Sequence, residues 1–229
     1  MKGPPEGFGP IDRLANLRER VAGSRVSGPV HPIIMAAAEG ELPGWAVLGA
    51  RRRAHVERVA LLMDAWAERL GADRSDRKRW RAAGLLHDVL REAPADELRR
   101  EVTRADAEIL PDIVLHGPAA SARLRSEGVR DEELLLAVAR HTTGHSDFGL
   151  MGRALYVADL VEPGRRLGPW RDAMLVGLPE RLVELTPEVT ARRLTRAIGQ
   201  GKPLISHSVA FWNALCAENG SDERGNTGI

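Results

Sequence analysis

Apolar residues recur along most of this chain at intervals of three and four, which is the spacing of one face of an α-helix. The first clear face comprises His55, Val59, Leu62 and Trp66. Helices are expected near 45–70, from Asp73 or Ser75 to Pro94, and over 94–102, 112–128, 131–141 and 150–163, with two or three more up to Glu218. No stretch shows the alternation of apolar and polar residues that a strand shows. The sequence therefore predicts an all-α fold.

The two ends of the chain differ from this helical middle. The start, MKGPPEGFGP, is rich in glycine and proline, and a short helix is expected only from Ile11 to Val21. The segment from His31 to Gly44 has no clear pattern. We expect an N-terminal extension over 1–44, partly disordered or in short helices, a helical domain over 45–218, and a flexible tail over 219–229.

Composition and charge exclude several classes of protein. The 33 lysines and arginines nearly balance the 32 aspartates and glutamates, so nothing calls for a nucleic acid polymer as partner. Cys216 is the only cysteine, which rules out an intrachain disulfide and a cysteine-rich zinc site and fits a reducing cytoplasm. The longest apolar runs fall short of the ~20 residues that a membrane helix needs, so we expect no membrane partner.

The stretch LLHDVL, residues 85–90, places His87 and Asp88 inside an apolar run. Burying such groups is costly unless they are hydrogen-bonded or bind a metal. Four more residues of these types fall on the apolar side of other expected helices or at helix ends. They are His55, His116, His141 and Asp159.

Imidazole and carboxylate together suit iron, manganese or zinc. Six residues are too many for one ordinary site but suit two ions, and a carboxylate shared by both, such as that of Asp88, would hold them ~3.5–4 Å apart. Taken singly, each of these histidines is more often a hydrogen-bonded structural residue. The joint pattern favours the metal site.

The order His55, His87-Asp88, His116, His141, Asp159 resembles the metal-binding signature of HD-domain phosphohydrolases. The stretches GLLHDVLREAP, LHGPAASARL, ARHTTG and LYVADLVEPGRR are more specifically similar to the bacterial YqeK-like group, over about residues 45–215. That resemblance implies an HD-domain helical bundle with a dinuclear metal site in its core. It also implies symmetrical cleavage of diadenosine tetraphosphate to two ADP by a hydroxide that bridges the metals.

The resemblance further implies a division of the ligands. His55, His87, Asp88 and Asp159 would bind one ion, and Asp88, His116 and His141 the other. The cofactors would be two divalent or mixed-valence transition-metal ions, with iron expected and manganese, cobalt or zinc as alternatives. The substrate remains open between diadenosine tetraphosphate and another nucleotide, such as a nucleoside triphosphate or a signalling nucleotide, and a non-catalytic nucleotide-sensing module is the further alternative. A homodimer is a reasonable prior for a bacterial enzyme.

Candidate substrate contacts come from arginines and one turn. Arg91, Arg153 and Arg165 could bind phosphate oxygens in pairs, and Arg91 joins Asp88 as a candidate catalytic residue. Arg91 stands where the family usually has lysine. An ordinary ion pair is the competing interpretation for each of these arginines. Thr142 and Gly144 could shape the turn that presents substrate. The triplet at 51–53, all arginine, is expected to be a solvated helix face.

Overall fold

The computed structural model describes residues 10–23 and 28–224 of the chain. Within these ranges it contains α-helices, one short 3-10 helix (η1) and no strand, which confirms the predicted all-α class. The elements are α1 (Pro10–Gly23), α2 (Pro32–Ala38), α3 (Ala50–Arg69), α4 (Arg74–Leu86), α5 (Ala95–Glu101), α6 (Arg104–Ile109), η1 (Asp112–Val114), α7 (His116–Ser126), α8 (Glu132–Arg140), α9 (Leu150–Val161), α10 (Pro169–Gly177), α11 (Leu182–Gly199) and α12 (Ser206–Arg224).

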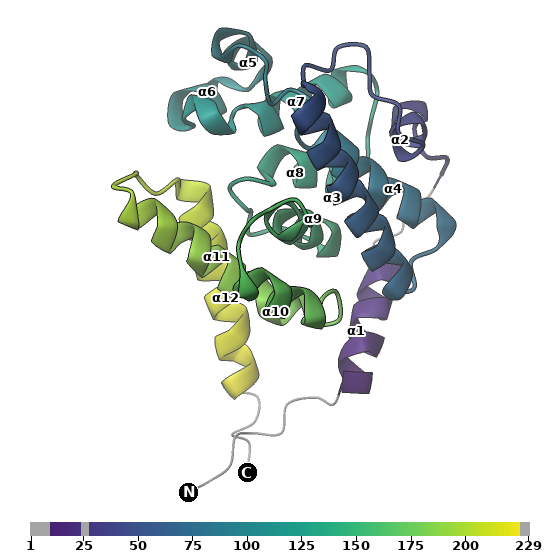
Figure 1. Cartoon of the computed structure of the whole chain (residues 1–229), viewed down its shortest axis with the longest axis vertical. Helices are drawn as coiled ribbons and strands as arrows, with labels where there is room; N and C mark the ends of the chain where they lie inside the picture. The colour runs from purple at the N-terminus through teal and green to yellow at the C-terminus, as the bar shows by residue number, and fades with distance from the viewer. Residues whose placement is uncertain (1–9, 24–27, 225–229) are drawn as a thin grey trace, which may run out of the picture.

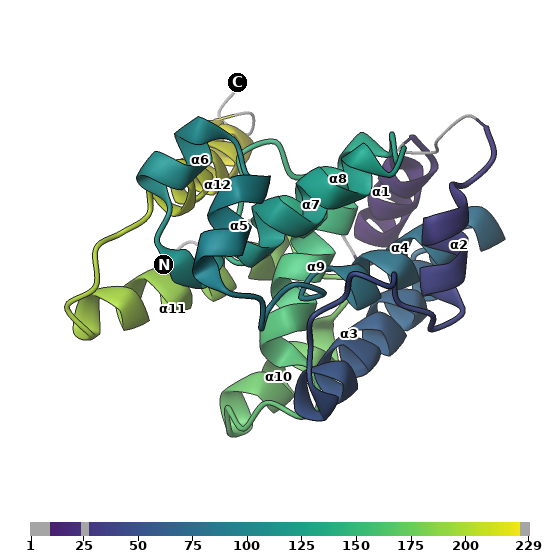
Figure 2. The same ribbon diagram turned by 90° about the horizontal axis from the view of Figure 1, so that it is seen from above.

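Helix α9 lies at the centre of the bundle (Figures 1 and 2). Helices α3 and α4 pack on one side of it and α11 on the other, while α8 covers it and packs in turn against α7. The sequence explains this position, because α9 is apolar around most of its circumference and a helix of that kind is buried. Eleven of its twelve residues are buried. A polar side chain on this helix therefore lies in the core unless it reaches the bundle's edge.

Two glycines allow neighbouring helices to approach closely beside the histidines identified above. A Cβ at Gly84 on α4 would lie 2.5 Å from the Cα of Ala60 on α3. A Cβ at Gly117 on α7 would lie 2.8 Å from the carbonyl oxygen of Ala139 on α8. Any larger residue at either position would force the backbones apart. These contacts set the spacing of the helix pairs α3–α4 and α7–α8.

Helix α4 ends earlier than the sequence indicated. It stops at Leu86, and Pro94 does not terminate it. The Nδ1 of His87 donates to the Gly84 carbonyl oxygen at 2.8 Å. In a continued helix, this oxygen would accept the backbone amide of Asp88 instead. The backbone that follows instead pairs with the loop before α3, where the Val47 amide donates to the Val89 carbonyl at 2.8 Å. His87 and Asp88 thus lie in a turn at the end of the helix.

Smaller differences occur elsewhere. Helix α6 was not expected, although Thr103 caps its first turn by accepting the Asp106 amide. Helix α2 fills part of the segment that showed no pattern, and α12 continues to Arg224, six residues past the expected boundary at Glu218. In the N-terminal extension, Leu17 of α1 is buried against the core. Two expectations, disorder at the start of the chain and flexibility at the end of its tail, fall on residues 1–9 and 225–229. These lie outside the described residues.

Among the described helices, none combines the length and the apolar character that crossing a membrane requires.

Candidate metal centre

Six polar side chains from five different segments meet in the middle of this bundle, and we call them the ligand cluster. His55 comes from α3, His87 and Asp88 from the turn after α4, His116 from the first residue of α7, His141 from the end of α8, and Asp159 from α9. All six are buried. The sequence predicted each of these residues as a metal ligand, and the fold brings them to one place.

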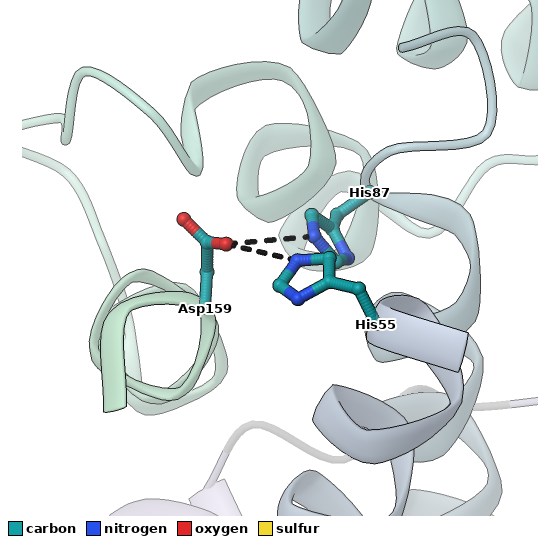
Figure 3. A group of neighbouring side chains, drawn as sticks. All are labelled: His55, His87 and Asp159. Carbon is teal, nitrogen blue, oxygen red and sulfur yellow. Dashed lines mark ion pairs between the residues drawn. The ribbon is translucent and has the colours of Figure 1, made fainter. Parts of the chain in front are cut away.

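One part of the ligand cluster is centred on Asp159 (Figure 3). Its Oδ1 lies 3.1 Å from Nε2 of His55 and 3.9 Å from Nε2 of His87. The three residues offer ligand atoms close enough together to hold one ion. They come from α9, α3 and the end of α4, so three separate helices must pack correctly to form this group.

Asp88 connects this group to the remaining histidines. Its Oδ1 lies 3.0 Å from Nε2 of His116 and 3.4 Å from Nε2 of His141. Its Oδ2 points the other way, 3.7 Å from Nε2 of His55 and 3.6 Å from Nε2 of His87. One carboxylate oxygen therefore faces each pair of histidines, as a residue shared between two ions requires. His87, Asp88 and His141 form a second group with ligand atoms close enough for one ion.

Hydrogen bonds on the outer nitrogens orient three of the four imidazoles. The Nδ1 atoms of His87 and His141 donate to the carbonyl oxygens of Gly84 and Val138, at 2.8 and 2.9 Å. The Nδ1 of His55 donates to Oε1 of Glu162 at 3.1 Å. Because these partners only accept, each Nδ1 carries a hydrogen and each Nε2 can offer a lone pair. This is the arrangement that orients metal-binding histidines. The Nε2 of His141 also lies 3.0 Å from Oγ1 of Thr142 and 3.1 Å from Nε2 of His116.

The cluster fits a metal ion because several of its inward atoms have no other partner. Nε2 of His55, Nε2 of His87 and Oδ1 of Asp88 are buried and lack a hydrogen bond to any residue that the structure describes. Each such atom costs about 1–3 kcal/mol when it is left unsatisfied. Two ligands that are each about 2.1 Å from one ion lie about 3.0–3.5 Å apart. The spacings of 3.1 Å between His55 and Asp159 and of 3.0 Å between Asp88 and His116 match this.

The protonation states also suit cation binding. Burial lowers the pKa of His87 to about 3, and burial lowers the pKa of His116 as well, so both rings are neutral near pH 7. Burial alone would raise the pKa of Asp159, but the His55 ring, 3.1 Å away, and the charges of Arg193 and Arg165 hold that pKa well below its ordinary value. The cluster therefore presents neutral imidazoles at His87 and His116 and ionised carboxylates at Asp88 and Asp159.

Arginines surround the carboxylates of the cluster. Arg52 contacts Oδ2 of Asp88 at 2.6 Å, and Arg165 contacts Oδ1 of Asp159 at 2.8 Å. Arg193 contacts Oδ2 of Asp159 at 3.1 Å. The Arg165 side chain is 39% exposed and the Arg52 side chain 26%, so both lie where the cluster meets solvent.

The predicted substrate contacts are only partly brought to the cluster. Arg165 lies there, and Oγ1 of Thr142 is 3.0 Å from Nε2 of His141. Arg91 donates to the carbonyl of Ile113 and is close enough to His116 to help lower its pKa.

The other two residues predicted to contact substrate have different neighbours. Arg153 is buried and pairs with Glu218 of α12 at 2.6 Å, so the competing interpretation of an ordinary ion pair applies to it. Gly144 has a φ of +76°, and a Cβ there would overlap the Phe211 ring. Turn geometry and packing account for this glycine.

Three residues that support the cluster were not predicted from the sequence. Arg52, assigned to a solvated face, pairs with Asp88, and Glu162 binds His55. Both had a signal, because Arg52 lies three residues before a ligand and Glu162 three residues after one, at the spacing of one helical turn. Arg193 lies 34 residues from Asp159 in sequence, so no helical spacing connects it to a residue of the cluster.

Three curated proteins that resemble this chain carry the same name. The chain is 24% identical over 149 residues to the symmetrical bis(5'-nucleosyl)-tetraphosphatase of Halalkalibacterium halodurans, covering 63% of this chain and 79% of that one. It is 34% identical over 107 residues to the protein of the same name from Bacillus subtilis, and 33% identical over 92 residues to that from Staphylococcus aureus. These two matches cover 43% and 37% of this chain, and they span about half of each relative, 54% and 46%.

A solved structure supports the fold. The chain superimposes with a TM-score of 0.67 on a protein from Clostridium acetobutylicum described as a "predicted HD superfamily hydrolase involved in NAD metabolism". The identity is 23%, and the match covers 81% of this chain and 96% of that one. The family described as HD domain matches residues 52–164, a span that contains all six residues of the ligand cluster. Residues 52–164 of this chain therefore form an HD domain.

Proposed function

We propose that this protein is a metal-dependent phosphohydrolase that cleaves diadenosine tetraphosphate symmetrically to two ADP. The observation that carries the proposal is the convergence of the ligand cluster, with buried lone pairs that have no other partner, in an HD domain. The names of the curated relatives support the substrate.

The ligand cluster would hold two ions, with His55, His87 and Asp159 on one side of Asp88 and His116 and His141 on the other. Bound ions would supply Lewis-acid polarisation of a phosphoryl oxygen and would acidify a water molecule. Iron is the metal that we propose first, and manganese, cobalt and zinc also accept imidazole together with carboxylate.

The chain's own residues prepare the site for a polyanion. In the part of the chain that the structure describes, the buried carboxylates of Asp88, Asp159 and Glu162 are paired with four arginines. These are Arg52, Arg58, Arg165 and Arg193. The arginines already balance the carboxylates before any cation binds, so two divalent ions would leave the site strongly positive. A chain of four phosphates offers the matching negative charge.

Individual side chains then have separate tasks. Arg165 and Arg91 can bind phosphate oxygens near the two ends of the ligand cluster, because a guanidinium presents paired donors. The Thr142 hydroxyl, beside His141, can orient the substrate or hold a proton at its Oγ1. The buried surroundings of Asp88 and His87 exclude bulk water, which strengthens each of these electrostatic contacts.

The proposal is tested by resolving products. Metal-free protein would be reconstituted with Fe²⁺, Mn²⁺ or Co²⁺ and given diadenosine tetraphosphate, ATP or GTP, with nucleotides separated by ion-exchange chromatography. We expect ADP as the sole nucleotide product from diadenosine tetraphosphate. Formation of ATP with AMP, or faster turnover of ATP or GTP, would contradict the assignment of substrate and cleavage position.

A pair of variants tests the role of the metal site. Asp88→Ala should lose bound metal and turnover together, whereas Asp96→Ala, at an exposed position on α5, should keep both. If purified Asp88→Ala retains its metal content and near-normal turnover, the proposed mechanism is wrong.

A further inference from the structure

Helix α11 lies outside residues 52–164, the span of the HD domain, and yet one of its side chains reaches the ligand cluster. That side chain is Arg193, which is partly buried. Its Nη2 donates to Oδ2 of Asp159 at 3.1 Å and to the carbonyl oxygen of Tyr156 at 3.0 Å. Its Nη1 donates to the carbonyl oxygen of Thr142 at 3.2 Å.

These contacts connect two parts of the cluster that are remote in sequence. Asp159 and Tyr156 belong to α9, whereas Thr142 directly follows His141 at the end of α8. The guanidinium also stacks on the Tyr156 ring, with its central carbon 4.3 Å from the ring centroid, and Tyr156 is itself buried. A planar group held by three oxygens and an aromatic face has little freedom to rotate.

The contact with Asp159 involves a specific oxygen. Arg193 binds Oδ2, whereas Oδ1 is directed toward His55 and His87 (Figure 3) and is also contacted by Arg165 at 2.8 Å. A carboxylate that binds an ion through one oxygen needs a fixed donor on the other to stop it from rotating. Arg193 supplies that donor, and its charge helps to keep Asp159 ionised.

We infer that Arg193 is a positioning residue that holds Asp159, and with it the ion bound by His55, His87 and Asp159, in the binding geometry. Helix α11 is thus a working part of the metal centre, although it follows the HD domain in sequence. The inference rests on the proposed metal site but not on the identity of the nucleotide.

The chain provides a matched control for a test. Arg192 is the preceding residue on α11 and also stacks on an aromatic ring, 4.3 Å from the centroid of Trp170, but it is exposed. Arg193→Gln, Arg193→Lys and Arg192→Gln would be titrated in metal-free form with Mn²⁺, and free Mn²⁺ would be followed by electron paramagnetic resonance. Near-ultraviolet circular dichroism would report on the packing of each variant.

Loss of an outer partner of a metal ligand typically weakens metal binding by about 10–100-fold. We expect a loss of that size in Arg193→Gln at one of two Mn²⁺ sites, with a smaller change at the second, which Arg193 reaches only through the Thr142 backbone. Arg193→Lys keeps the charge but cannot reach three oxygens, so it should recover only part of the affinity. Arg192→Gln should bind like the wild type.

Wild-type Mn²⁺ affinity at both sites in folded Arg193→Gln would overturn the inference. An equal loss at both sites would also overturn it, because that indicates general damage to the fold. If Arg193→Gln does not fold, the Mn²⁺ affinity of Arg193→Lys is the test instead. Unchanged Mn²⁺ affinity at both sites of that variant would overturn the inference. Wild-type protein that binds two Mn²⁺ ions but hydrolyses no nucleotide would refute the proposed function and leave this inference standing.

Discussion

Replacing Gly84 by alanine should force α4 away from α3 beside the ligand cluster. The added Cβ would lie 2.5 Å from the Cα and 2.8 Å from the amide nitrogen of Ala60. Carbon atoms in ordinary contact are about 3.5–4.0 Å apart, so the helices must separate by roughly 1 Å. The opposing atoms belong to the backbone, and no side-chain rotation can relieve the overlap.

The size of the effect follows from two opposing contributions. Alanine in place of glycine inside a helix gains about 1 kcal/mol. Overpacking costs typically about 1–3 kcal/mol, and the upper end applies where backbone meets backbone. The free energy of unfolding of the metal-free protein should therefore fall by about 2 kcal/mol. Because His87 follows Gly84 by three residues and His55 precedes Ala60 by five, the same shift separates two ligands and should weaken metal binding.

Urea unfolding followed by circular dichroism measures the stability, and Mn²⁺ titration measures the affinity. Gly199→Ala is the matched control, because Gly199 ends α11 without a positive φ and a Cβ added there would meet no atom within 4 Å. That variant should be as stable as the wild type or up to about 1 kcal/mol more stable. If Gly84→Ala behaves like Gly199→Ala in both measurements, the close approach of α3 and α4 does not limit the site and the reasoning is refuted.

Three further predictions concern charge. Because burial lowers the pKa of His87 from 6.5 to about 3, the unfolded metal-free chain binds a proton below pH 6.5 that the folded chain excludes. As the pH falls from 6.5 to about 3, this residue should lower the free energy of unfolding by about 1.4 kcal/mol per pH unit. In urea unfolding, His87→Gln should show a weaker dependence of that free energy on pH. An equal pH dependence in the two proteins would contradict the prediction. Glu162→Gln removes the charged partner of His55 and should weaken Mn²⁺ binding by about 10–100-fold, with unchanged affinity as the contrary result. Arg165→Gln should raise the KM for diadenosine tetraphosphate and change the melting temperature little. Arg153→Gln should lower the melting temperature and leave the KM unchanged. The opposite pattern would show that the roles of the two arginines are misassigned.

The sequence was most informative about the candidate ligands, for a physical reason. A histidine or aspartate within an apolar helical face is conspicuous because burial without a partner is costly. His87, Asp88 and Asp159 all stand out in this way, and the structure buries each of them in the ligand cluster. Helix spacing alone also identified His55 and His141 on the apolar side of their helices.

The arginines were the least predictable part of the site. A guanidinium sits on a long side chain that can reach in several directions, so its position in sequence does not fix its partner. Arg52 was expected in solvent and pairs with Asp88, whereas Arg153 was expected at phosphate and pairs with Glu218. Both outcomes depend on which neighbouring helix offers a carboxylate.

By itself, the sequence predicted the helical class and singled out the six residues of the ligand cluster, because helical periodicity and the cost of burying polar groups are local properties of the chain. Only the tertiary structure decided which imidazole nitrogen faces inward, which oxygen of Asp159 faces His55, and that Arg193 approaches from α11. Those features depend on how helices distant in sequence pack together, and the close contact at Gly84 shows how narrowly that packing is set.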